Sequence, residues 1–264
     1  MEDLSQVTIW RYIDLAKFVS LLANEALYFA CPSELHDPYE GYLPRQYVEA
    51  FSGALQEMVD DLLKLRAQIL DKHADADLRS LDEGFLRMRS VQHEALKKVR
   101  LRFGVSCWHM GDYESEAMWK LYSASGQGIA IASSVQQLEE SIVADDSLVV
   151  DRVRYVDFAK DSVEKGHRHY TLFLKRKSFE HERELRATIR LREEGKGSLV
   201  KCDLNTLINR VHVSPFAESY LKPIVEYLCA ARPQALNKPV IQSSLFDQPD
   251  YGIEIHLPPD FTSR

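Results

Sequence analysis

The sequence has few cysteines, no long apolar run and no excess of positive charge. Its four cysteines, Cys31, Cys107, Cys202 and Cys229, lie far apart without a CxxC pair, which argues against a zinc site built from paired cysteines. No stretch approaches the roughly 18 uncharged apolar residues of a transmembrane helix, so we expect no membrane partner. No secretory signal is visible at the N-terminus, and we therefore expect a cytoplasmic protein with reduced thiols.

The balance of charge limits the partners that the chain can have. The 33 lysines and arginines are outnumbered by 40 acidic residues, which gives a net charge of -7. This charge argues against broad, nonspecific binding of nucleic acid, because such binding depends on neutralising phosphates. The 264 residues, 45% of them hydrophobic, suit one globular domain over 1–264, since no linker interrupts the pattern.

Periodicity of the apolar residues predicts the elements of an α+β fold. The first part reads as a strand over 7–12, a helix over 15–24 with Asp14 as its N-cap, and a strand over 26–30. Apolar residues at steps of three and four predict helices over 45–72 and 77–100. Further strands are predicted over 104–108, 128–133, 149–155, 184–191, 210–214 and 239–243, with a helix over 217–229. We expect a central, mostly antiparallel sheet, with an αα-hairpin over 45–102 inserted into it or laid over it.

Three segments carry residues suited to chemistry, and the first contains Arg11 in the opening strand. The planar guanidinium of arginine suits phosphate or carboxylate groups. Its neighbours Trp10 and Tyr12 are aromatic, so we expect Arg11 to be partly desolvated. It could bind a ligand, or it could pair with an acid such as Asp37 or Glu40.

The second segment holds Ser106, followed by a short predicted helix with Ser115, Trp119 and Tyr122 near one face. An aromatic face beside a glycine turn could stack a flat ring such as nicotinamide or a base. Packing in the core would explain Trp119 equally well.

The third segment carries two carboxylates, Glu182 and Glu184. If the strand begins by Glu182, both share one face with Arg186. If a helix continues to Glu184, then Glu182 pairs with Arg186 at a spacing of four. Two such carboxylates could raise each other's pKa, hold a sugar hydroxyl or bind a metal, or they could belong to a solvated run of charges.

An ordered set of short motifs resembles a bacterial family of unknown function, the one numbered 2971, over roughly residues 9 to 190. The motifs are Trp10-Arg11-Tyr12, Leu27-Tyr28-Phe29-Ala30, Asp37-Pro38-Tyr39-Glu40, Ser106-Cys107-Trp108, Ala117-Met118-Trp119-Lys120-Leu121-Tyr122, Gly128-Ile129-Ala130-Ile131 and Glu182-Arg183-Glu184-Leu185-Arg186. The family name implies no activity.

The layout is also similar, more loosely, to that of ADP-ribosyltransferases. That similarity implies an NAD-using enzyme in a bacterial toxin or phage-defence setting, with a protein or nucleic-acid target. Arg11, beside Tyr12, would bind the diphosphate or ribose of NAD, and Ser106 with Tyr122 would line the nicotinamide pocket. Glu184, supported by Glu182, would bond the ribose 2′-hydroxyl and stabilise an oxocarbenium-like transition state. The chain departs from that family at Ser106-Cys107-Trp108, where a Ser-Thr-Ser run would stand, and in its long hairpin.

Two other functions fit the same residues. A metal-dependent phosphodiesterase or nuclease could use Asp37, Glu40, Glu182 and Glu184, since magnesium sites need one or two carboxylates plus the substrate phosphate. A non-catalytic sensor could bind a nucleotide or a protein, with the charged motifs serving structure. Convergence of Arg11, Trp119, Tyr122 and Glu184 on one cleft would favour the transferase.

Overall fold

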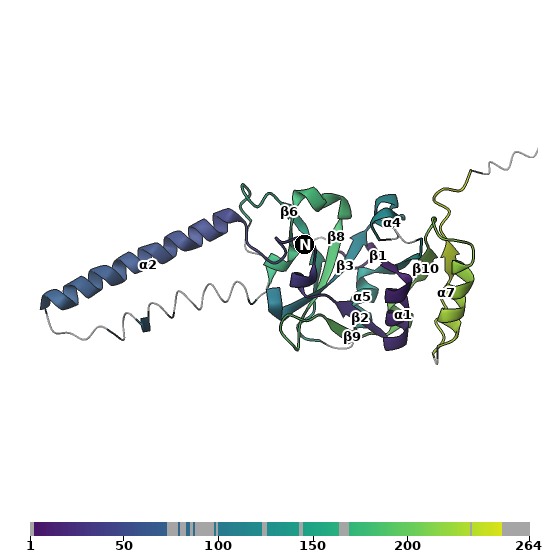
Figure 1. Ribbon diagram of the computed structural model, residues 1–264, viewed down its shortest axis with the longest axis horizontal. Coiled ribbons are helices and arrows are strands. Elements are labelled where there is room, and N and C mark those ends of the chain that lie inside the picture. Colours follow the sequence, from purple (N-terminus) through teal and green to yellow (C-terminus); the bar gives the residue numbers. More distant parts are fainter. Residues whose placement is uncertain are drawn as a thin grey trace, which may run out of the picture.

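The structure, a computed structural model, describes residues 3–72, 79, 83–84, 87, 98, 100–122, 126–142, 145–163, 169–232 and 234–249. Its centre is a sheet of seven strands in the order β11-β10-β4-β1-β3-β8-β5 (Figure 1). These strands are β1 (Thr8–Asp14), β3 (Phe103–Met110), β4 (Gly128–Ser134), β5 (Val149–Arg152), β8 (Glu184–Arg190), β10 (Arg210–Val213) and β11 (Val240–Gln242). Neighbours are antiparallel except β10 and β11, so the predicted α+β class and mostly antiparallel sheet are confirmed.

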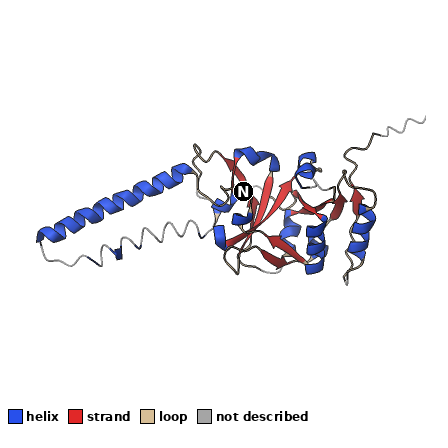
Figure 2. Cartoon of the chain, viewed as in Figure 1, coloured by secondary structure: helices blue, strands red, loops and turns tan. Residues whose placement is uncertain are grey.

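Two small sheets flank the central one (Figure 2). β2 (Ala26–Phe29) pairs with β9 (Ser198–Lys201), and β6 (Arg154–Val156) pairs in parallel with β7 (Leu174–Arg176). A bridge between Ala30 and Val105 joins the end of β2 to β3. The strand predicted over 149–155 is thus two strands, β5 and β6, interrupted at Val153, whose N–H bonds the carbonyl of Glu184.

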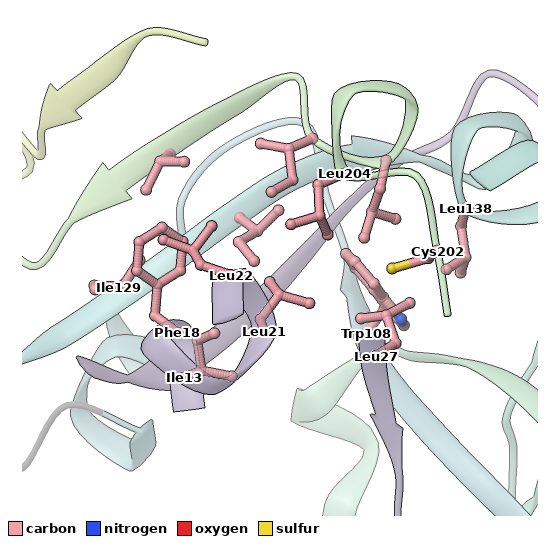
Figure 3. Packing of buried hydrophobic residues seen from close by; sticks show 14 of the residues in the cluster. Ile13, Phe18, Leu21, Leu22, Leu27, Trp108, Ile129, Leu138, Cys202 and Leu204 are labelled. Atoms are coloured by element: carbon pink, nitrogen blue, oxygen red, sulfur yellow. The ribbon is translucent and has the colours of Figure 1, made fainter. Parts of the chain in front are cut away.

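The opening strand, helix and strand form where the sequence predicts them. Asp14 ends β1 and caps α1 (Leu15–Asn24) by accepting a hydrogen bond from the backbone N–H of Lys17. The helix ends at Glu25, whose left-handed φ of 45° turns the chain into β2. One face of α1 is buried, and Phe18, Leu21 and Leu22 supply it as predicted (Figure 3).

The two faces of the sheet have separate apolar clusters. The larger cluster joins side chains of alternate strand positions, such as Ile9 and Trp108, to α1, α6 (Leu204–Leu207) and α7 (Leu221–Ala230). The smaller one, on the opposite face, packs Trp10 and Tyr12 against Met118 and Trp119 of α4 (Glu116–Tyr122). Because successive side chains of β1 alternate between these clusters, both faces of β1 are covered.

The predicted helix over 45–72 is confirmed as α2 (Arg45–Lys72), which extends away from the sheet (Figure 1). None of its described side chains is buried, so α2 does not lie over the core. Most of the second predicted helix, over 77–100, lies outside the described residues. The packed hairpin over 45–102 therefore stays a prediction. Among the described residues, none of the helices combines the length and apolar character needed to cross a bilayer.

Strand β8 has the predicted alternation, with Leu185 and Ile189 in the larger cluster. Its charged face is not solvated, however, because Glu184, Arg186 and Thr188 are buried as well. The helix predicted over 217–229 is also displaced, since α7 begins at Leu221.

Replacing Ile189 with Asp should unfold the protein, because an unpaired charge in the core costs about 3 kcal/mol or more. Ile189 is 2% exposed, whereas Ile241 in β11 is 38% exposed. The matched variant Ile241→Asp should lose less than about 1 kcal/mol of unfolding free energy in urea denaturation. Equal stabilities of the two variants would contradict the placement of β8.

Candidate functional site

Strands β1 and β3 are neighbours in the sheet, but they separate soon after they meet. β1 pairs with β4 at seven positions, from Thr8 to Asp14, and β3 pairs with β8 at seven positions. Between β1 and β3 only two pairs form, Ile9 with Met110 and Trp10 with His109. Beyond Trp10 the facing edges of the two strands lack each other as hydrogen-bond partners, and other groups must satisfy them.

Arg11 lies in this gap and bonds to the strands around it. Its guanidinium donates hydrogen bonds to Ser106 Oγ and to the carbonyl oxygens of Cys107, at 3.5 Å, and Tyr28, at 3.2 Å. Its carbon Cζ lies 5.7 Å from the centroid of the Trp108 ring. Burial lowers the pKa of Arg11, although an arginine keeps its charge in proteins.

The acids considered as partners of Arg11 lie elsewhere. Asp37 pairs with Arg176, with 2.8 Å between Oδ1 and Nη2, and Glu40 pairs with Arg186. Within the described part of the chain, no carboxylate lies within ion-pair distance of Arg11. The prediction that Arg11 is partly desolvated is confirmed, and its positive charge has no counterion among the described residues.

A cleft of about 680 Å³ opens at the gap and takes side chains from both faces of the sheet. Its volume is in the range of small-molecule sites. Most of its lining is apolar or aromatic, and five of the residues predicted for the site line it: Arg11, Tyr12, Tyr122, Glu182 and Glu184. Of the four residues whose convergence on one cleft would favour the transferase, Arg11, Tyr122 and Glu184 line the cleft and Trp119 does not.

Two predicted site residues, Ser106 and Trp119, do not line the cleft. Both are fully buried. Ser106 Oγ accepts hydrogen bonds from Arg11 and from Trp108 Nε1, so it orients these side chains. The indole N–H of Trp119 donates to Glu114 Oε2 at 2.9 Å, and its ring packs edge-on against Tyr12. Trp119 is a core residue and does not stack a ligand.

The tyrosines of the cleft carry neutral hydroxyls. Burial raises the pKa of Tyr12 to about 12, and its hydroxyl oxygen accepts a hydrogen bond from the backbone N–H of Ser115. Burial also raises the pKa of Tyr122, and nearby Glu182 and Glu184 add to that shift. Tyr122 is still partly exposed, so its ring is available to a ligand.

Two residues of the cleft lining, Glu182 and Glu184, belong to a largely buried network of charges. Arg186 donates two hydrogen bonds to Glu40, of 2.7 and 2.8 Å, and two to Glu184, of 2.7 and 3.1 Å. Lys175 Nζ lies 2.5 Å from Glu182 Oε2, 3.0 Å from Glu184 Oε2 and 3.7 Å from Glu40 Oε1. We call these five residues the charge network. Its three carboxylates and two cations leave one net negative charge.

Glu184 is the carboxylate at the centre of the charge network. Burial alone would raise its pKa, but Arg186 and Lys175 outweigh burial and lower the pKa to about 2. Glu184 is therefore ionised at every physiological pH. It can stabilise positive charge, but it cannot serve as a general acid.

The local backbone differs from both alternatives considered for Glu182 and Glu184. Glu182 ends the 3₁₀ helix η3 (Lys177–Glu182), Arg183 is left-handed with φ of 41°, and β8 begins at Glu184. The turn at Arg183 brings both carboxylates to Lys175. No glycine marks this turn, so the sequence gives no local signal for it.

Lys175 and His109 are parts of the site that the sequence did not identify. Lys175 belongs to a basic run, Lys175-Arg176-Lys177, which is more often a solvated surface. His109 lines the cleft, and its Nδ1 lies 2.7 Å from the carbonyl oxygen of Glu182. Burial lowers the pKa of His109, so its ring is neutral at pH 7. A carbonyl only accepts hydrogen bonds, so Nδ1 carries the proton.

The carboxylates considered for a metal site form ion pairs with basic side chains of the protein. Asp37 pairs with Arg176, Glu40 and Glu184 pair with Arg186, and Glu182 pairs with Lys175. In the ranges that the structure describes, no group of three or more His, Cys, Asp or Glu side chains is arranged to hold a metal ion.

Comparison with known proteins adds no relative. No protein-family model, no curated protein and no solved structure matches the chain.

Replacing Arg186 with Met should cost about 3–5 kcal/mol of unfolding free energy, because Glu40 and Glu184 would stay buried without their main cation. Arg102 provides a matched control, since it pairs with Glu194 at 2.6 Å on the surface. Arg102→Met should cost less than about 1 kcal/mol. Chemical denaturation measures both, and similar losses would show that the charge network does not stabilise the fold.

Proposed function

We propose that the protein is an NAD-using, ADP-ribosyltransferase-like enzyme, and that NAD binds in the cleft between β1 and β3. One observation carries this proposal. The cleft is lined by an arginine that has no counterion in the described part of the chain, by a pair of carboxylates, and by aromatic and apolar side chains. A dinucleotide that carries a negative diphosphate and a positively charged nicotinamide ring matches that distribution.

Arg11 is the residue that would bind the diphosphate. Its guanidinium is fixed by Ser106, Cys107 and Tyr28, so little side-chain entropy is lost on binding. These three hydrogen bonds to the protein do not use all five N–H donors of the arginine, so donors remain for a ligand. A phosphate would provide the missing counterion in a partly desolvated place, where charge-assisted hydrogen bonds are strong.

Glu182 and Glu184 are the residues that would act at the nicotinamide ribose. In the transfer, the bond between ribose C1′ and the ring nitrogen breaks, and its electron pair leaves with neutral nicotinamide. The ribosyl group becomes positively charged as this bond breaks, until a nucleophile of the target, or water, donates an electron pair to C1′ and loses its proton. An ionised, preorganised carboxylate stabilises such a developing positive charge.

The aromatic side chains of the cleft would hold the ring of the leaving group. Tyr12 and Tyr122 line the same cleft as Glu182 and Glu184. Their hydroxyls stay neutral, so they add no charge that would compete with the carboxylates. A flat ring stacks well on such side chains. We include in the proposal a protein or nucleic-acid target and a toxin or phage-defence setting.

A sensor that binds the nucleotide without cleaving it is a second candidate. It is favoured by the contacts of Glu184, since both of its carboxylate oxygens are bonded to Arg186 and Lys175. In this alternative the charge network is structural, and the cleft only recognises its ligand. The phosphodiesterase has less support, because each carboxylate it needs is paired with a cation of the protein.

The wild-type protein should bind NAD and release nicotinamide, alone or with a target. Glu182→Gln and Glu184→Gln should each lower the rate of release at least about tenfold and leave NAD affinity nearly unchanged, because the carboxylates act mainly on charge that develops in the transition state. Arg11→Ala should weaken binding, since a diphosphate contact is already made in the ground state. Calorimetric titration with NAD and a nicotinamide-release assay separate these effects.

Two outcomes would contradict the transferase. Absence of NAD binding by the wild type would remove both the transferase and an NAD sensor. Binding without release, unchanged by Glu182→Gln, would favour the sensor. Melting temperatures of the variants serve as the control for folding, and Glu182→Gln is the safer variant because Glu182 is the more exposed carboxylate.

A further inference from the structure

A second cavity lies on the sheet at the end where β1 begins, β4 ends and β10 begins. Its volume is about 460 Å³, and it shares no lining residue with the cleft between β1 and β3. Nearly all of its lining is polar. Thr8 of β1 faces it, beside Ser134, its cross-strand partner on β4.

Arg210, the first residue of β10, is the cation of this second cavity. It is directly opposite Ala132, which is in turn opposite Trp10. Because Ala132 is small, the guanidinium reaches across it, and its carbon Cζ lies 5.4 Å from the centroid of the Trp10 ring. That stacking fixes the plane of the guanidinium.

In the part of the chain that the structure describes, the guanidinium of Arg210 has no hydrogen-bond acceptor. Among the described residues, no carboxylate pairs with it and no hydrogen bond satisfies it, and Nε is shielded from solvent. A partly buried guanidinium without an acceptor is unfavourable, and an anion in the cavity would relieve that cost.

Polar groups with spare hydrogen bonds surround Arg210. Gln137 and Asn209 form a reciprocal amide pair, with bonds of 2.7 and 2.6 Å. Each amide group has a second N–H, because the pair uses only one from each side. Glu140 is exposed at the rim, and its Oε1 accepts a hydrogen bond from Gln136. Its negative charge is screened by water, so Arg210 dominates the interior.

We propose that this second cavity binds a phosphorylated sugar, with the phosphate on Arg210 and the hydroxyl groups on the amides of Gln137 and Asn209. The guanidinium suits the bidentate recognition of phosphate. A phosphate alone would leave most of the cavity empty, and the amides and the Thr8 hydroxyl suit a ligand with several hydroxyl groups. The two cavities have no lining residue in common, and Trp10, on which Arg210 stacks, belongs to the lining of the cleft.

Titration with glucose 6-phosphate, followed by calorimetry and by backbone amide shifts, tests the proposal. The wild type should bind glucose 6-phosphate with a Kd of about 1 mM or lower, and glucose at least about tenfold more weakly. Arg210→Gln should weaken binding about tenfold or more, and Arg210→Lys should weaken it less, because the charge remains but the planar fork is lost. Glu140→Gln should tighten binding a few-fold at low salt.

Three results would overturn the proposal: no binding at about 10 mM glucose 6-phosphate, equal affinity for glucose, or an Arg210→Gln variant with unchanged affinity. If Arg210→Gln does not fold, the backbone amide shifts of the wild type on titration with glucose 6-phosphate locate the site. They should cluster at 132–137 and 209–210, and shifts confined to the cleft would overturn the site. NAD titration of Arg210→Gln keeps this test apart from that of the transferase. Arg210 does not line the cleft, so the variant should lose binding of the sugar phosphate and keep binding of NAD.

Discussion

The separation of β1 from β3 is the constraint on which the site depends. Each strand stays fully paired on its other side, β1 with β4 and β3 with β8, so the two halves of the sheet keep their order while they diverge. The gap leaves backbone groups in need of partners, and Arg11 supplies donors to the carbonyls of Cys107 and Tyr28. The guanidinium that bonds these backbone carbonyls lines the cleft, and no carboxylate of the described residues pairs with it. Arg11 therefore both satisfies backbone carbonyls at the gap and offers a positive charge to a ligand.

The charge network sets the electrostatics of the other end of the cleft. Two cations and three carboxylates are buried together, which is tolerable only because nearly every charge has a partner at hydrogen-bond distance. Arg186 and Lys175 keep Glu184 ionised, and the network as a whole retains one negative charge. The lining of the cleft thus combines the positive charge of Arg11, the negative charge of Glu182 and Glu184, and aromatic side chains. This combination is the basis for proposing a ligand with separated charges.

The sequence predicts the local elements well and the charge network poorly. α1 and its cap at Asp14 follow from residues within a few positions of each other, and β8 follows from strict alternation. The partners of Arg186 could not be predicted in this way, because Glu40 stands 146 residues earlier and sequence spacing says nothing about that contact. The sequence left open whether Trp119 stacks on a ligand or packs in the core, and the structure buries its indole, which bonds Glu114. Arg183, which brings Glu182 and Glu184 together, adopts a left-handed conformation without the glycine that would signal it.

Hydrogen–deuterium exchange with and without NAD is the most direct test of the claim that the gap between β1 and β3 is the ligand site. The amides of β1 that face the gap beyond Trp10 have no partner in β3, so a ligand held there should slow their exchange. We expect NAD to protect peptides covering 11–14, 27–30, 105–109 and 182–184, and to leave 209–213 unchanged. Binding of NAD with protection elsewhere, or with none in these segments, would contradict the account.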